Sequence, residues 1–154
     1  MARAGWKKVL VLTGLVFAGL LLAVQLVPYG RSHSNPPMTA EPSWNAPGTR
    51  ALAQRACFDC HSNETRWPWY SHVAPVSWLV QADVDEGRRV LNFSEWTRAY
   101  EEAPESGETV REQEMPPRSY LLLHPEARLS DAERQQLAAG LDATLGPARS
   151  SEHE

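Results

Sequence analysis

Two cysteines and a histidine stand close enough in this chain to contact one flat ligand. They form the run Cys57-Phe58-Asp59-Cys60-His61. On a helical turn, positions three and four apart share a face, so both thiols and the imidazole can reach the same group. This spacing is the attachment signature of a c-type haem, whose vinyl groups form thioether links with the sulfurs while the histidine binds the iron.

The same motif is compatible with other kinds of site. Cys57 and Cys60 are the only cysteines in the chain, so a four-cysteine zinc or iron–sulfur centre from this chain alone is excluded. A disulfide, a thioredoxin-like redox pair, and a zinc site with His61 and a distant histidine are the alternatives. The redox pair expects a βαβ setting that is not legible here, and adjacent Cys60 and His61 would chelate zinc awkwardly. We therefore expect one covalent haem c, with His61 as proximal iron ligand.

Met115 is the candidate for the opposite face of the iron. In Met115-Pro116-Pro117 the prolines fix their own φ angles and bias Met115 toward an extended conformation. The thioether would then sit on a stiff loop well downstream of the haem motif. Methionine with histidine is the coordination found in cytochromes c. His72 and His124 are the alternatives.

Large aromatic side chains follow the haem motif. Trp67, Trp69 and Trp78 are candidates for the wall of a haem pocket, although tryptophans filling an ordinary small core would predict the same burial. Arg66 or Arg118 could pair with the haem propionates, because a guanidinium matches a carboxylate in bidentate geometry.

An apolar run over residues 9–27 is long enough to cross a bilayer as a helix. Arg3, Lys7 and Lys8 precede it, which predicts a cytoplasmic N-terminus and an exported remainder. A cleaved signal peptide would have a shorter apolar region and a small-residue cleavage site. No such site is clear, so we expect an uncleaved anchor, with a cleaved signal as the alternative. The predicted location is the bacterial inner membrane, single-pass, with the C-terminal domain in the periplasm.

The chain predicts one small exported domain of roughly 100 residues. The expected parts are a signal anchor at residues 1–30, a proline- and serine-rich tether at 31–48, a haem-binding domain at 49–146 and a polar tail at 147–154. A covalently held haem would contribute much of the core of so small a domain.

The exported part is acidic. Three of the 15 basic residues precede the apolar run, and the remaining 12 are arginines set against all 19 acidic residues, which leaves a net charge of −7. This charge disfavours nucleic acid and suits a redox partner with a basic patch. The alternative is that this modest acidic excess only keeps the domain soluble.

Helical periodicity and capping signals predict an all-α domain around the haem, and no hairpin signal is present. Ser130 and Glu133 form a capping box ahead of a leucine-bearing helix that Gly146 closes. The expected helices cover residues 50–60, 75–92, a short stretch from Ser94 that carries Trp96 and Tyr100, and the stretch from Ser130 to Gly146.

Several motifs together resemble the bacterial haem-binding domain family of cytochrome c-like proteins. They are residues 57–70, 74–78, 83–88, 91–96, 115–120 and 124–130, which cover nearly the whole exported domain. The resemblance implies a covalent c-type haem in a small membrane-anchored or exported protein. It implies no particular reaction.

The leading hypothesis is a membrane-tethered c-type cytochrome that transfers electrons, with His61 and Met115 as axial ligands. No independent catalytic constellation is visible, so we expect a carrier and not an enzyme. The alternatives are a haem-based sensor or gas-binding module with an open sixth position, and a cofactor-free domain stapled by a Cys57–Cys60 disulfide.

Overall fold

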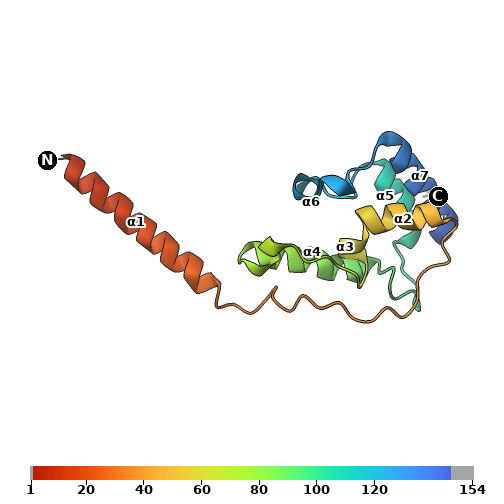
Figure 1. The fold of residues 1–154 in the computed structure, drawn as a ribbon, viewed down its shortest axis with the longest axis horizontal. Helices are drawn as coiled ribbons and strands as arrows, with labels where there is room; N and C mark the ends of the chain where they lie inside the picture. Colours follow the sequence, from red (N-terminus) through yellow and green to blue (C-terminus); the bar gives the residue numbers. More distant parts are fainter. Residues whose placement is uncertain (1, 147–154) are drawn as a thin grey trace, which may run out of the picture. The chain divides into compact units, whose positions relative to one another are not determined.

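A computed structural model describes residues 2–146, so the predicted polar tail at 147–154 lies outside the described residues. Within that range the fold is all-α, as predicted, and its only β pairing is an isolated bridge between Ala40 and Glu95. The helices, drawn in Figure 1, are α1 (Ala2–Val24), α2 (Pro47–Ala56), α3 (Phe58–His61), α4 (Val76–Val90), α5 (Ser106–Arg111), α6 (Arg118–Leu123) and α7 (Asp131–Leu145).

The chain forms two compact units. The first combines the residues up to His33 with Trp67–Ala82, and the second combines Ser34–Arg66 with the residues from Asp83 onward. The helix α4 begins in the first unit and ends in the second.

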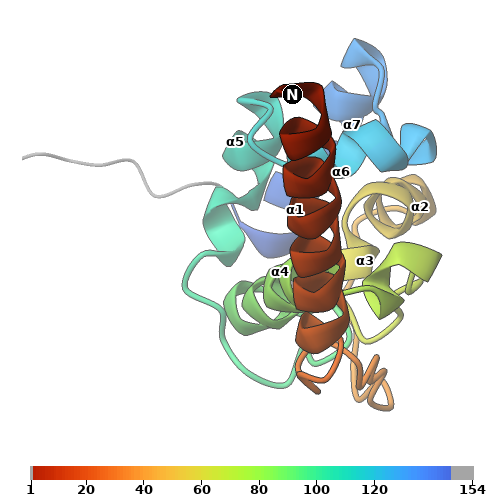
Figure 2. The same cartoon turned by 90° about the vertical axis from the view of Figure 1, so that its left-hand side faces the viewer.

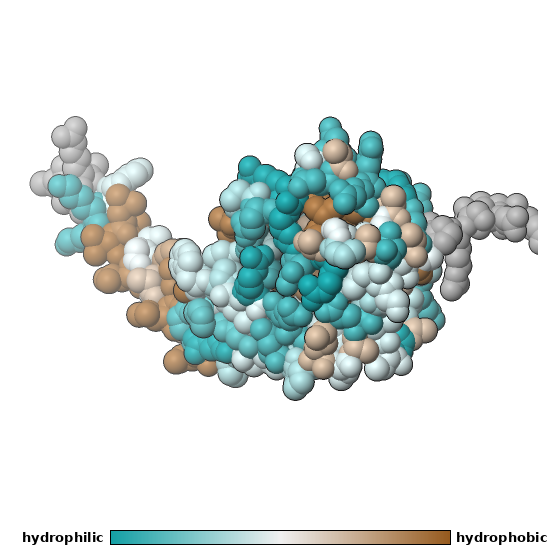
Figure 3. Space-filling model, turned by 45° about the vertical axis from the view of Figure 1, so that its right-hand side comes forward, coloured by the Kyte–Doolittle hydropathy of each residue, from teal (hydrophilic) through white to brown (hydrophobic). Residues whose placement is uncertain are grey.

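The first unit is dominated by α1, a single continuous helix (Figures 1 and 2). Its stretch Gly5–Val24 is long and apolar enough to cross a membrane, and none of it is buried inside the protein. Figure 3 shows apolar side chains gathered along this helix. The predicted N-terminal apolar helix is therefore present.

The end of α1 is fastened to the start of α4. The Gln25 side chain donates to the Ala74 carbonyl at 2.8 Å and accepts from the Ala74 N–H at 3.0 Å. Gly30 has φ +76°, and a Cβ there would lie 2.5 Å from the Ser77 carbonyl oxygen. Only glycine permits both this conformation and this close approach.

The second unit has a core in which α2 and α5 pack against α7. Gly140 on α7 makes the close contact with α2 possible, because a Cβ there would lie 2.2 Å from the Thr49 hydroxyl oxygen. The buried apolar core consists of Leu52, Ala53, Phe58, Leu91, Phe93, Tyr100, Ala103, Val110, Leu137, Ala138 and Leu141.

The helix expected over residues 50–60 is two helices, α2 and α3. The chain leaves the helical region at Cys57, where φ is −124° and ψ is −32°. The capping box of α7 is present as predicted: the Ser130 hydroxyl accepts from the Glu133 N–H, and the Glu133 carboxylate accepts from the Ser130 N–H at 2.8 Å.

The short helix expected from Ser94 is wrong, since residues 91–100 contain none. Ser94 is buried, and its hydroxyl accepts a hydrogen bond from the Asn63 N–H at 3.0 Å. Its own N–H donates to the Asn92 side chain at 2.9 Å. These side-chain bonds satisfy the backbone in place of a helical ladder.

The predicted tether is held against the second unit from residue 34 onward. The Thr39 N–H donates to the Ser94 carbonyl at 2.8 Å, and Glu41 forms a salt bridge with Arg50 at 2.6 Å. The Trp44 ring lies 5.1 Å from that of Phe93. Proline content predicts an extended chain but does not determine whether that chain is free.

Candidate haem-binding site

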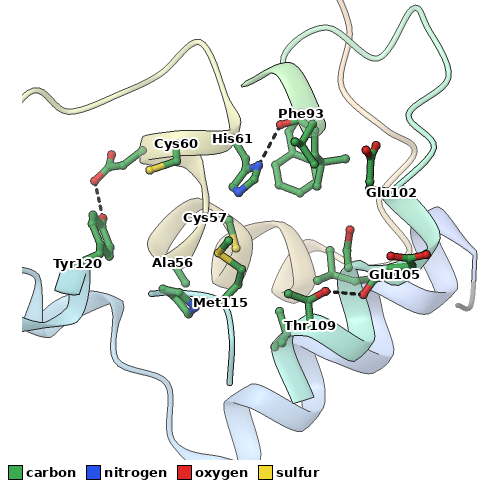
Figure 4. A pocket seen from close by; sticks show the side chains of 17 residues that line it. Ala56, Cys57, Cys60, His61, Phe93, Glu102, Glu105, Thr109, Met115 and Tyr120 are labelled. Atoms are coloured by element: carbon green, nitrogen blue, oxygen red, sulfur yellow. Dashed lines mark hydrogen bonds between the residues drawn. The ribbon is translucent and has the colours of Figure 1, made fainter. Parts of the chain in front are cut away.

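The second unit contains an apolar cavity of about 260 Å³ beside the Cys57–His61 motif. Figure 4 shows Cys57, Cys60 and His61 at the cavity, with the Met115 side chain reaching it from another segment. The apolar part of the lining includes Ala56, Val90, Leu91, Phe93, Val110 and Leu141. The polar residues at the cavity include Glu102, Glu105 and Thr109.

The break between α2 and α3 positions the motif. The Cys57 N–H still donates to the Ala53 carbonyl at 2.7 Å, while the Cys57 carbonyl accepts from the N–H groups of Cys60 and His61 at 3.2 and 2.9 Å. The motif thus forms a helical turn of its own, and all three side chains line one cavity.

His61 is held by the segment that follows α4. Its Nδ1 lies 3.1 Å from the Leu91 carbonyl oxygen, and the Phe93 N–H donates to the His61 carbonyl at 2.8 Å. An Nδ1–H donated to a carbonyl leaves Nε2 as the free ligand atom. Burial lowers the pKa of His61, while the carbonyls of Leu91 and Gly87 oppose that shift. The neutral imidazole that binds metals is therefore favoured.

The two thiols are free, with no disulfide between them. Burial raises the pKa of Cys57 to about 12, and burial together with the nearby Asp83 and Asp59 raises the pKa of Cys60 to about 12. Reactive redox cysteines have lowered pKa values and a largely ionised thiolate. This environment therefore does not favour a thioredoxin-like role.

Gly87 on α4 allows the close approach of α4 to the motif. A Cβ at this position would lie 2.5 Å from the Cys60 carbonyl oxygen. Any side chain at Gly87 would therefore displace the turn that carries both Cys60 and His61.

Met115 lies on the loop after α5 and is 39% exposed. The N–H groups of Glu114 and Met115 both point to the Thr109 carbonyl, at 3.1 and 3.4 Å, which ties this loop to α5. The structure thus brings Met115 to the same cavity as His61.

The two alternative histidines do not line this cavity. The His124 ring stacks on Tyr120 at 3.9 Å between centroids, and its Nδ1 lies 2.9 Å from the Tyr120 carbonyl oxygen. The His72 ring lies 4.4 Å from that of His33 in the first unit.

The three predicted pocket tryptophans do not line this cavity either. They belong to the first unit, where Trp67 lies 4.6 Å from the His33 ring and Trp69 is 77% exposed. The aromatic residues nearest the motif are others: Phe93 lies 6.5 Å from the His61 ring and 5.6 Å from Phe58.

One group at the cavity was missed by the sequence interpretation. Asp59, inside the motif, accepts a hydrogen bond from the Tyr120 hydroxyl at 2.7 Å. It also accepts from the backbone N–H of Arg66 at 3.1 Å and from its guanidinium at 3.2 and 3.3 Å. Arg66, a candidate partner for a propionate, is thus paired with Asp59. The signal available in the sequence was an aspartate between the two cysteines with an arginine seven residues later.

The residues present fit a haem. The cavity is apolar, and it presents two thiols, an oriented imidazole and a thioether, which are the groups that attach and coordinate a c-type haem. Within the described range no three His, Cys, Asp or Glu side chains gather as metal ligands. A zinc site that adds a distant histidine to the motif is therefore not assembled there.

A family model described as a haem-binding domain matches residues 19–143. The searches of curated proteins and of solved structures gave no match. The match covers most of the chain, including the motif and the residues that line the cavity. The chain belongs to the haem-binding domain family.

Proposed function

We propose that this protein is a membrane-tethered c-type cytochrome that carries electrons on the outer side of the bacterial inner membrane. The observation that carries the proposal is the convergence of Cys57, Cys60, His61 and Met115 on one apolar cavity. Cys57 and Cys60 would attach a single haem through thioether links. The protein would act as a carrier and not as a stand-alone enzyme.

The haem, when bound, supplies an iron that exchanges one electron. The chain's own contribution is to hold and shield it. The Leu91 carbonyl orients His61, and Met115, which lines the same cavity, would supply a second iron ligand. Apolar residues around the cavity, among them Val110 and Leu141, exclude water. Low polarity and a methionine ligand both favour a raised reduction potential.

The tether rests on α1. Its apolar stretch Gly5–Val24 meets the length that a bilayer requires. The basic residues before it favour a cytoplasmic N-terminus. Gln25 at its end is hydrogen-bonded to Ala74, which supports an anchor that is kept as part of the folded protein. The acidic exported part would meet redox partners that carry basic patches.

The test is spectroscopy of the full chain made together with a c-type maturation system. The oxidised protein should show the low-spin spectrum and the weak far-red band of a thioether sulfur bound opposite histidine. His61→Ala should abolish that spectrum. Replacing Cys57 and Cys60 together should remove haem staining on a denaturing gel, because only thioether links survive denaturation. Undiminished staining would contradict covalent attachment.

A haem-based sensor or gas-binding module is the second candidate. The observation that favours it is the exposure of Met115, since a partly exposed thioether on a loop can be displaced by a diatomic ligand. Rapid carbon monoxide binding to the reduced wild type would favour the sensor. Slow or absent binding would favour the carrier.

A further inference from the structure

The first unit exposes a group of large apolar side chains just beyond the end of α1. Leu26 is 84% exposed, Trp69 77% and Leu79 66%. Apolar surface of this extent on a soluble protein usually marks a site that another surface covers. We define the interfacial surface as Leu26, Val27, Tyr29, Trp69, Val73, Val76 and Leu79, all of which are exposed.

The chain's own hydrogen bonds place these residues at the level where α1 ends. Gln25 immediately precedes Leu26, and its side chain makes two hydrogen bonds with Ala74. Val73 and Val76 flank Ala74 along the chain. If α1 crosses the bilayer, Gln25 lies at its surface, and the segment around Ala74 must lie there too.

Charge separates this unit from the rest of the protein. All 19 acidic residues lie outside the first unit. Beyond α1, the only Lys or Arg in that unit is Arg31. A surface without carboxylates can approach anionic lipid headgroups without repulsion, whereas the acidic second unit is repelled by them.

The aromatic content is that of a membrane interface. Trp and Tyr are enriched where headgroups meet acyl chains, because one part of the ring is apolar and another part is polar. The chain has 6 Trp and 4 Tyr, and half of them stand in the two short segments of the first unit that follow α1. They are Tyr29, Trp67, Trp69, Tyr70 and Trp78, of which Tyr29 and Trp69 are exposed and belong to the interfacial surface.

We propose that the interfacial surface is inserted in the headgroup and upper acyl layer of the leaflet at which α1 ends. The protein would then contact the membrane in two places, through the α1 span and through the adjoining interfacial surface. This inference rests on the proposed membrane span of α1, and it adds a second, shallower lipid contact that the span alone does not require.

Photo-crosslinking of the full-length haem protein in vesicles of phosphatidylcholine and phosphatidylglycerol tests the proposal. One diazirine lipid carries its reactive group near the glycerol and another near the terminal methyl. Trypsin cleavage after Arg66 and Arg88 releases residues 67–88, and cleavage after Lys8 and Arg31 releases residues 9–31. The shallow probe should label 67–88, and the deep probe should label 9–31 only.

Two double variants distinguish lipid contact by the interfacial surface from nonspecific lipid contact by any exposed apolar side chain. Trp69→Ser with Leu79→Ser should lose most of the shallow adduct on 67–88. The matched control is Leu122→Ser with Leu123→Ser, which removes two leucines that are 75% and 62% exposed on α6 of the second unit. This control should leave the adduct unchanged.

The outcomes distinguish lipid contact by the interfacial surface from the α1 span. Deep labelling of residues 9–31 with no lipid adduct on residues 67–88 would contradict the lipid contact of the interfacial surface and leave the span in place. No labelling of either peptide would contradict both the membrane span of α1 and the lipid contact of the interfacial surface. A lipid adduct on residues 67–88 that decreases as the number of chains per vesicle rises would show that a second copy of the chain covers the interfacial surface. This result would contradict the lipid contact.

Discussion

At the scale of single residues, Met115 is the side chain on which the electronic properties of the proposed cytochrome depend. Met115→Ala should lower the reduction potential by part of the range of about 0.8 V that axial ligands span. It should also let carbon monoxide bind the reduced protein, because the position opposite His61 would be open. Redox titration and gas binding measure both effects. The control is His124→Ala, which should change neither; an unchanged potential in Met115→Ala would remove Met115 as ligand.

Asp59, which is buried, and Tyr120, which is half-buried, form a hydrogen bond at the cavity. Burial and the Asp59 carboxylate both raise the pKa of the Tyr120 hydroxyl, so it remains a proton donor at neutral pH. Tyr120→Phe should destabilise the protein by about 2 kcal/mol, because it leaves the carboxylate short of a hydrogen bond. Denaturant unfolding measures this, with the exposed Tyr29→Phe as control. Equal stability of both variants would show that the contact contributes little.

At the scale of helices, Gly87 allows α4 to approach the haem motif. Gly87→Ala should cost about 1–3 kcal/mol by overpacking, although alanine is the better helix former. The matched control is Gly48→Ala in α2, where a Cβ would meet only the flexible Gln136 side chain at 3.1 Å. Thermal unfolding of the haem-loaded proteins should rank Gly87→Ala well below Gly48→Ala. Equal melting temperatures would contradict the close approach.

The capping box of α7 stabilises the protein through the Ser130 hydroxyl. Ser130→Ala should destabilise the protein by about 1 kcal/mol, because an N–H in the first turn of α7 loses its acceptor. Ser130→Asp should recover most of this loss, since its carboxylate can accept the same bond. Chemical denaturation measures both variants, and a failure of aspartate to rescue would point to a cause other than capping.

Glu133 makes the stability of α7 depend on pH. The Ser130 N–H, then Arg55 and the Ser130 hydroxyl, lower its pKa to about 2. Because the folded-state pKa is below the unfolded value, the stabilising contribution is complete above about pH 4.5 and is lost as pH falls toward 2. Glu133→Gln should flatten this part of the stability profile. Denaturation at a series of pH values measures this effect. If Glu133→Gln loses the same free energy of unfolding at low pH as the wild type, the loss comes from other carboxylates.

Elements specified by local signals were predictable, and elements specified by distant partners were not. The Ser130 box was legible because both partners lie within one helical turn. The loop at Ser94 was mistaken for a helix start because its hydroxyl bonds to Asn63, which lies 31 residues away. The same reason explains the tether predicted at residues 31–48, which belongs to the second unit from Ser34 onward, since Trp44 meets Phe93 only in the folded chain.

The candidate site divides in the same way. Cys57, Cys60 and His61 follow from a short motif, and Met115 from the stiffness of its prolines. The tryptophans were assigned by closeness in sequence, but they lie in the first unit. The contact between Gly87 and Cys60 is a close approach of two backbone segments, and no pattern of residues in the sequence predicts it.

At the scale of the whole molecule, the net charge of −7 beyond the apolar run should favour cationic over anionic redox partners of the proposed cytochrome. Oxidation by a trivalent cobalt cation should be about tenfold or more faster at low salt than its driving force alone predicts, and salt should slow it. Ferricyanide should show the opposite salt dependence. Stopped-flow measurement at several ionic strengths checks this. The same sign for both reagents would show that the charge does not act near the haem.

The pairing of α2 with α7 also bears on how the protein is made. Leu141 of α7 lines the same cavity as Cys57 and Cys60, yet α7 is the last described helix along the chain and is therefore synthesised after the others. In the proposed cytochrome, Cys57 and Cys60 would be accessible for haem attachment before α7 docks, and docking of α7 would then cover the cavity. We therefore expect attachment of the haem to precede docking of the last described helix.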